Sequence, residues 1–182
     1  GFFLFDDQYL TDHPEAPIPQ RYSGLYGLGR QLLQEYGVGP YNMTRGRGIK
    51  VAVIEWAYYA GHEDLDVIPE PGQTMIMIPE ITSPEHATAC LGIINAQING
   101  FGMNGMAPDA QAYFFPITSV EEGPREFAAW VRMMQTLGHG DVASCSYGPG
   151  VGLNCVEVNW DLIRMASDLR ITVGVSAEKF RI

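Results

Sequence analysis

The chain has 182 residues, of which 46% are hydrophobic, and its formal net charge is −10. This length and composition fit a single sizeable core rather than two separate domains. The acidic balance argues against nucleic acid as a partner, because phosphate binding needs clustered Lys and Arg. No stretch approaches the roughly 18 to 20 apolar residues of a membrane span.

The first part of the chain differs in character from the rest. Residues 1–47 are rich in Gly and Pro and contain one credible short helix, at 30–36. This composition predicts an extended N-terminal arm packed on a domain that occupies residues 48–182.

From residue 48 onwards, apolar strands alternate with helical patterns. We expect strands at 50–55, 74–78, 112–117, 141–146 and 171–176, and helices at 86–97, 125–137 and 157–169. Strands that alternate with helices of about 10 to 15 residues imply right-handed crossovers, and hence an α/β fold with a mostly parallel sheet. Residues at helical spacing predict two core-facing stripes: Phe127, Val131 and Met134, and then Val158, Leu162, Ala166 and Leu169.

Glu55 and His86 are the candidate functional pair. Glu55 ends the first predicted strand, and His86 opens the first predicted helix. Nucleophilic hydrolysis uses such a pair, because a histidine takes the proton from a hydroxyl while a carboxylate fixes its tautomer. A structural ion pair at Glu55 and an ordinary helix-opening histidine are the alternatives. Ligands bind beyond the carboxyl ends of parallel strands, where Glu55 and the segment 146–148 both fall.

A nucleophile is not evident among the serines. None of them lies in Gly-x-Ser-x-Gly or Gly-Thr-Ser, the contexts that expose a nucleophilic hydroxyl. The chain alone therefore presents no complete triad. The serines are Ser23, Ser83, Ser119, Ser144, Ser146, Ser167 and Ser176.

Several segments resemble the subtilisin-like serine peptidases (subtilases). The run 51–55 with His62-Glu63-Asp64-Leu65 is similar to the family's strand ending in Asp and its His-Pro-Asp-Leu. The runs 86–92 (His-Ala-Thr-Ala-Cys-Leu-Gly) and 105–108 (Gly-Met-Ala-Pro) are similar to His-Gly-Thr-His-Val-Ala-Gly and Gly-Val-Ala-Pro. The run 141–148 resembles the strand that carries the family's Ser-Leu-Gly edge.

The resemblance implies a three-layer α/β, subtilisin-like domain that is incomplete at its C-terminus. It implies a serine endopeptidase in which Glu55 orients His86, the general base. Ser146, Tyr147 and Gly148 would bind an extended peptide or protein substrate as an added strand. Lys179 stands at the oxyanion position, where the family has Asn. The nucleophile block would lie beyond residue 182, or on a second chain that carries the missing part.

The resemblance also implies secretion or another extracytoplasmic location, and a structural calcium ion. The loop 97–103 matches the family's calcium loop in length, and calcium takes six to eight oxygen ligands. Asp64 and Asn99 would supply side-chain oxygens, and loop carbonyls would supply the others. A plain Asn-Gly turn is the alternative.

Departures from the family pattern favour a second hypothesis. Glu55 replaces Asp, Ala87 and Ala89 replace Gly and the second His, and Lys179 replaces Asn. Because loss of one oxyanion donor alone costs about 10² to 10³ in rate, the chain is alternatively an inactive pseudopeptidase that binds peptides or serves as a scaffold. A structural subunit of a larger assembly is a third possibility, since an uncovered sheet would need a partner.

Overall fold

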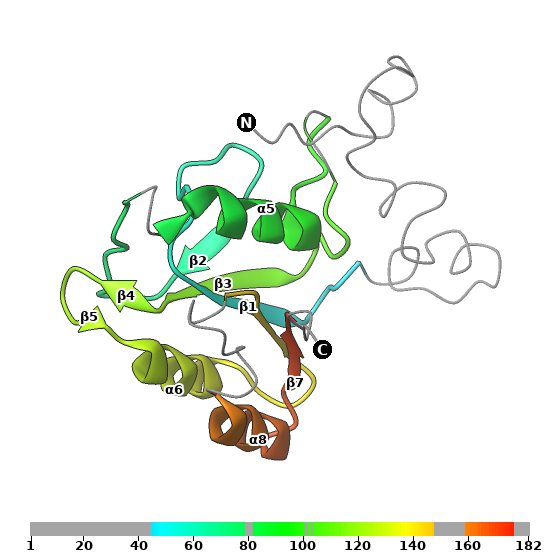
Figure 1. Cartoon of the computed structure of the whole chain (residues 1–182). Coiled ribbons are helices and arrows are strands. Elements are labelled where there is room, and N and C mark those ends of the chain that lie inside the picture. The colour runs from blue at the N-terminus through cyan, green and yellow to red at the C-terminus, as the bar shows by residue number, and fades with distance from the viewer. Residues whose placement is uncertain (1–44, 79–81, 101, 103, 148–158, 177–182) are drawn as a thin grey trace, which may run out of the picture. The chain divides into compact units, whose positions relative to one another are not determined.

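The computed structural model describes residues 45–78, 82–100, 102, 104–147 and 159–176 (Figure 1). The arm expected at 1–47, apart from its last three residues, lies outside these ranges, as does its short helix. Within the described ranges the chain forms two compact units. One unit contains residues 45–48, 60–66 and 89–110, and the other contains residues 49–59, 67–88 and 111–176.

A five-stranded sheet forms the centre of the second unit. The strand order is β2-β3-β1-β6-β7, and every pairing between these strands is parallel. The strands are β1 (Lys50–Glu55), β2 (Val67–Pro69), β3 (Gln111–Pro116), β6 (Val142–Cys145) and β7 (Thr172–Val175). The predicted α/β class and parallel sheet are therefore confirmed.

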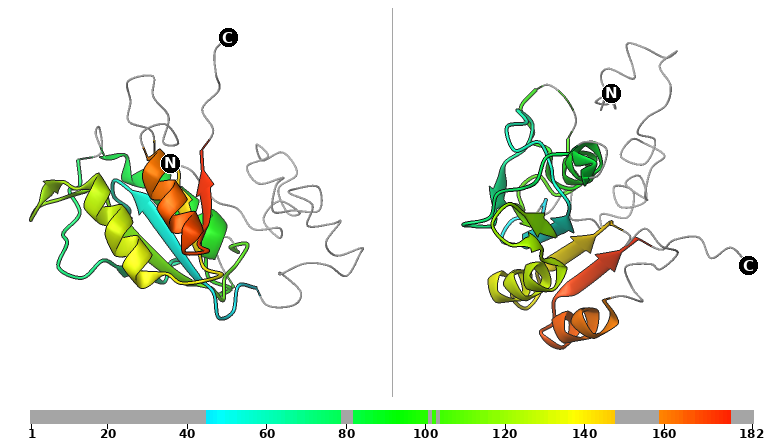
Figure 2. Two further views of the ribbon diagram at one scale, coloured as in Figure 1. Left: turned by 90° about the horizontal axis from the view of Figure 1, so that it is seen from below. Right: turned by 60° about the vertical axis from the view of Figure 1, so that its left-hand side comes forward.

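Among the described residues, three helices accompany the sheet, as expected for a three-layer α/β fold. They are α5 (Pro84–Asn95), α6 (Glu126–Thr136) and α8 (Trp160–Asp168). Helices α6 and α8 lie on the same face of the sheet (Figure 2). None of the helices in the described ranges is long and apolar enough to cross a membrane.

The central strand β1 is the most deeply buried element. Its residues 51–55 are all buried, as expected for a strand with neighbours on both edges and both faces covered. Its last residue, Glu55, pairs with Pro116 of β3, and the Glu55 carbonyl accepts the Ile117 N–H at 2.9 Å. The backbone that carries the Glu55 carboxylate is thus fixed by the sheet.

The strand predicted at 74–78 is wrong. Only Met75 forms a bridge, antiparallel to Ser119, and Met77 is 44% exposed. The sheet edge beside β3 is occupied by β2, which is too short to give a sequence pattern. A small hairpin, β4 (Thr118–Ser119) with β5 (Gly123–Pro124), was also not predicted.

The face that α6 buries differs only in part from the prediction, because Met134 of the predicted stripe packs, partly buried, against the core. Phe127 is 67% exposed, whereas Trp130 is fully buried. The apolar residues of this helix lie on more than one of its faces, so periodicity alone does not show which face is buried. The large indole of Trp130 occupies the core. The buried side chains of α6 are Ala129, Trp130 and Met133.

On α8 the prediction holds for Leu162 and Ala166, which are buried. Leu169, which follows the last residue of this helix, is 52% exposed. Val158 lies outside the described residues.

Candidate functional site

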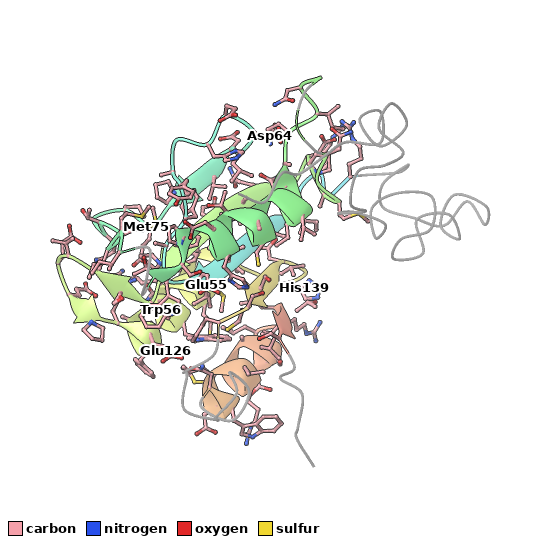
Figure 3. All side chains as sticks on the ribbon, turned by 45° about the horizontal axis from the view of Figure 1, so that its top comes forward. Glu55, Trp56, Asp64, Met75, Glu126 and His139 are labelled. Atoms are coloured by element: carbon pink, nitrogen blue, oxygen red, sulfur yellow. The ribbon has the colours of Figure 1, made fainter. Side chains whose placement is uncertain are left out.

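Glu55 lies at the carboxyl end of β1, where its side chain is only 3% exposed (Figure 3). Oε1 accepts the backbone N–H of Trp56 at 3.1 Å. Oε2 accepts no well-aligned hydrogen bond from the described residues and lies 3.4 Å from Nδ1 of His86. Because a buried carboxylate needs a partner, the histidine is the group that accounts for its position.

His86 lies in the first turn of α5, and its backbone N–H donates to the Ser83 carbonyl at 2.9 Å. The imidazole is 49% exposed, although the carboxylate beside it is buried. Nδ1 is thus the ring nitrogen that faces Glu55. The sequence motif thus brings together the two side chains it singled out, at a separation slightly longer than an ideal hydrogen bond.

Three residues that the sequence reasoning did not single out link the loop after Glu55 to the helical turn that carries His86. Thr88 Oγ1 donates to the Pro84 carbonyl at 2.7 Å and accepts the Tyr59 N–H at 3.0 Å. The Tyr59 hydroxyl donates to Oε1 of Glu85 at 2.7 Å. For Thr88 the sequence did contain a signal, because His86-Ala87-Thr88 matches the His-x-Thr of the subtilase pattern.

The expected substrate edge is described only in part. Ser146 follows β6 and is half-buried, while Gly148 lies outside the described residues, as does Lys179. The Cys145 carbonyl accepts the Ser176 N–H at 3.0 Å, which continues the β6–β7 pairing to the same end of the sheet as Glu55.

The Tyr147 side chain packs in the core. Its hydroxyl donates to Glu126 Oε1 and accepts the Trp130 Nε1–H at 3.1 Å. Asn159 Nδ2 donates to the same Glu126 oxygen at 2.7 Å. Burial raises the pKa of Tyr147 well above its ordinary value of 10.0. Any contact of Tyr147 with a substrate would therefore use its backbone rather than its buried ring.

Asp64 and Asn99, the predicted calcium ligands, are neighbours. Asp64 is 3% exposed, and its Oδ1 accepts the Asn99 Nδ2–H at 2.9 Å. The Asp64 carbonyl accepts the Gln97 N–H at 3.0 Å. A cation would have to replace the Asn99–Asp64 hydrogen bond and turn the amide oxygen inwards. Within the described ranges no cluster of three or more His, Cys, Asp or Glu side chains could hold a metal.

Comparison with known proteins finds similarity to a protease. The chain is similar to the minor extracellular protease Epr of Bacillus subtilis (strain 168), with 24% identity over 133 residues. This match covers 73% of the chain but only 17% of the relative, so the chain spans about a sixth of that protein's length. No family model matches the chain.

Proposed function

We propose that this chain is the N-terminal part of a subtilisin-like serine endopeptidase domain. In this domain Glu55 orients His86, and His86 acts as the general base. The observation that carries the proposal is the contact between a buried strand-end carboxylate and a half-exposed histidine, 3.4 Å apart. The similarity to an extracellular protease supports the same reaction class and an extracellular location.

The chemistry follows from the two ring nitrogens. Glu55 favours the tautomer with the proton on Nδ1, so that Nε2 can accept a proton from an attacking hydroxyl. When His86 becomes an imidazolium ion, the adjacent carboxylate stabilises the new charge. The longer separation seen here is compatible with this role, because catalytic hydrogen bonds often tighten only when substrate binds.

The nucleophile belongs, in this proposal, to sequence beyond these 182 residues, on the same chain or on a second one. An extended peptide would bind along the backbone at 146–148 as an added strand. Lys179 would stand at the oxyanion position.

A peptide-hydrolysis assay on the full-length protein tests the proposal. We expect cleavage by the wild-type protein and loss of cleavage to background in His86→Ala. The matched control is His139→Ala, which changes an exposed histidine in the loop before β6. Cleavage that persists in His86→Ala would contradict the proposed role.

A pseudopeptidase is the second candidate. It is favoured by the incomplete hydrogen bonding of Glu55 Oε2 and by Glu55, Ala87 and Ala89, which all replace residues of the subtilase pattern. A full-length protein that binds extended peptides but does not react with a fluorophosphonate serine probe would support this candidate. Labelling by the probe would exclude it.

We also propose that Asp64 and Asn99 bind a calcium ion, as part of the same subtilisin-like assignment. It is supported by the buried Asp64 carboxylate beside the loop that begins at Gln97. Calcium titration followed by thermal unfolding tests it: added calcium should raise the Tm of the wild-type protein but not that of Asp64→Asn. Equal responses in both proteins would contradict it.

A further inference from the structure

Two hydrogen bonds join the loop after Glu55 to the helical turn that carries His86. The first runs from the Tyr59 N–H to Thr88 Oγ1 at 3.0 Å. The second runs from the Tyr59 hydroxyl to Glu85 Oε1 at 2.7 Å. Residue 59 is thus tied to α5 at positions immediately before and two residues after His86.

The loop between Glu55 and Tyr59 is itself firmly packed. Ala57 is fully buried and Tyr58 is 2% exposed. The Tyr58 ring packs against Phe114 of β3, with ring centroids 4.6 Å apart. A displacement of the first turn of α5 relative to Tyr59 would therefore change the distance from His86 to Glu55, because the loop does not follow freely.

Thr88 has a hydrogen-bonding role that ordinary helical threonines lack. Its hydroxyl donates to the carbonyl four residues earlier, Pro84, as helical threonines often do. Thr136 on α6 makes the same kind of bond to the Arg132 carbonyl at 2.9 Å. Thr88 differs because it is buried, with 7% exposure, and also accepts an N–H from another segment.

We propose that Thr88 is a positioning residue that sets the separation between Glu55 and His86, with the Tyr59–Glu85 hydrogen bond as a second tie. This inference rests on the proposed function, because it assigns Thr88 and Tyr59 a task at that site. Neither residue needs to touch the substrate.

The protonation states of Tyr59 and Glu85 suit the hydrogen bond between them. The hydrogen bond from Tyr59 holds the pKa of Glu85 below its ordinary value, so Glu85 is a carboxylate near neutral pH. The same hydrogen bond raises the pKa of Tyr59, so the phenol keeps its proton. The donor and the acceptor are therefore both in the required state.

The test uses the full-length protein and two readouts, the side-chain ¹⁵N NMR signals of His86 and peptide-hydrolysis kinetics. In the wild-type protein we expect the proton mainly on Nδ1. Thr88→Val should give a mixture of tautomers closer to free histidine, with kcat lowered about tenfold and KM changed less than about twofold. Thr88→Ser should restore both readouts, since it keeps the hydroxyl.

Thr136→Val is the matched control, because it removes the same intrahelical bond at a distant helix. It should leave both readouts unchanged. If Thr88→Val does not fold, Tyr59→Phe carries the test, since it removes one exposed hydroxyl and should shift the tautomers in the same direction by less. Unchanged tautomers in whichever of these two variants folds would overturn the positioning role. A tautomer change in a protein without peptidase activity would contradict the proposed function alone.

Discussion

Shortening Glu55 to the residue that subtilases carry should harm this site rather than repair it. Oε2 of Glu55 is 3.4 Å from Nδ1 of His86. Glu55→Asp removes one methylene and withdraws the carboxylate by about 1.5 Å. The separation would then be about 5 Å, which is beyond hydrogen-bonding reach.

The backbone has little freedom to compensate. The Glu55 carbonyl accepts the Ile117 N–H at 2.9 Å, and β1 is paired along both edges. Misplacement of a catalytic group by about 1 Å can cost on the order of a hundredfold in rate. We therefore expect Glu55→Asp to lower kcat by about a hundredfold while changing KM little.

Peptide-hydrolysis kinetics on the full-length protein provide the assay, and urea unfolding checks that the variant is folded. Glu63→Asp is the matched control, because Glu63 is exposed and undergoes the same shortening. Activity of Glu55→Asp equal to or above that of the wild-type protein would refute the argument from distance.

Three further predictions concern the stability of the folded protein. Arg125→Met should lower the free energy of unfolding by about 3 to 5 kcal/mol in urea titrations. The reason is that the buried Glu70 carboxylate loses the guanidinium that donates two hydrogen bonds to it, of 2.6 and 2.7 Å. A loss below about 1 kcal/mol would contradict this prediction. Tyr147→Phe should cost about 1 to 3 kcal/mol in the same assay, since the buried Trp130 N–H loses its acceptor, and an unchanged midpoint would contradict that. The guanidinium of Arg45 holds the pKa of Asp109 below its ordinary 3.8, so the folded state binds this proton less readily than the unfolded state. The stability that this carboxylate contributes is present above about pH 4 and is lost as pH falls through the lowered pKa. Between pH 5 and pH 3, thermal melts should therefore show a smaller drop in Tm for Asp109→Asn than for the wild-type protein. Equal drops in Tm would contradict the assignment.

The parallel sheet was predictable because each long strand is an apolar run bounded by turn residues. The run 51–54 is buried on both faces of the sheet, so its sequence is continuously apolar rather than alternating. The three-residue strand β2 is too short to produce such a pattern. The Met-Ile-Met-Ile run at 75–78 satisfies the pattern, but it forms only one isolated bridge, from Met75 to Ser119, so its apolar content alone does not predict a strand.

The contact between Glu55 and His86 was predictable to a similar degree. Spacing identified Glu55 and His86, because a strand end and a helix start in an α/β fold meet at the same sheet edge. The Thr88 and Tyr59 hydrogen bonds depend on how one loop packs against one helical turn, and no sequence period encodes that contact. Likewise Tyr147 was predicted at the substrate edge, but the hydrogen bonds of its hydroxyl with Trp130 and Glu126 hold its ring in the core.

Labelling of a serine by a fluorophosphonate probe tests the central claim most directly, because it requires both an activated hydroxyl and His86. In the full-length protein we expect a labelled serine outside these 182 residues. Labelling should be at least about a hundredfold slower in His86→Ala and in Glu55→Gln, and unchanged in His139→Ala. Absence of labelling, or labelling at the wild-type rate in His86→Ala, would contradict the assignment of Glu55 and His86 to a serine peptidase site.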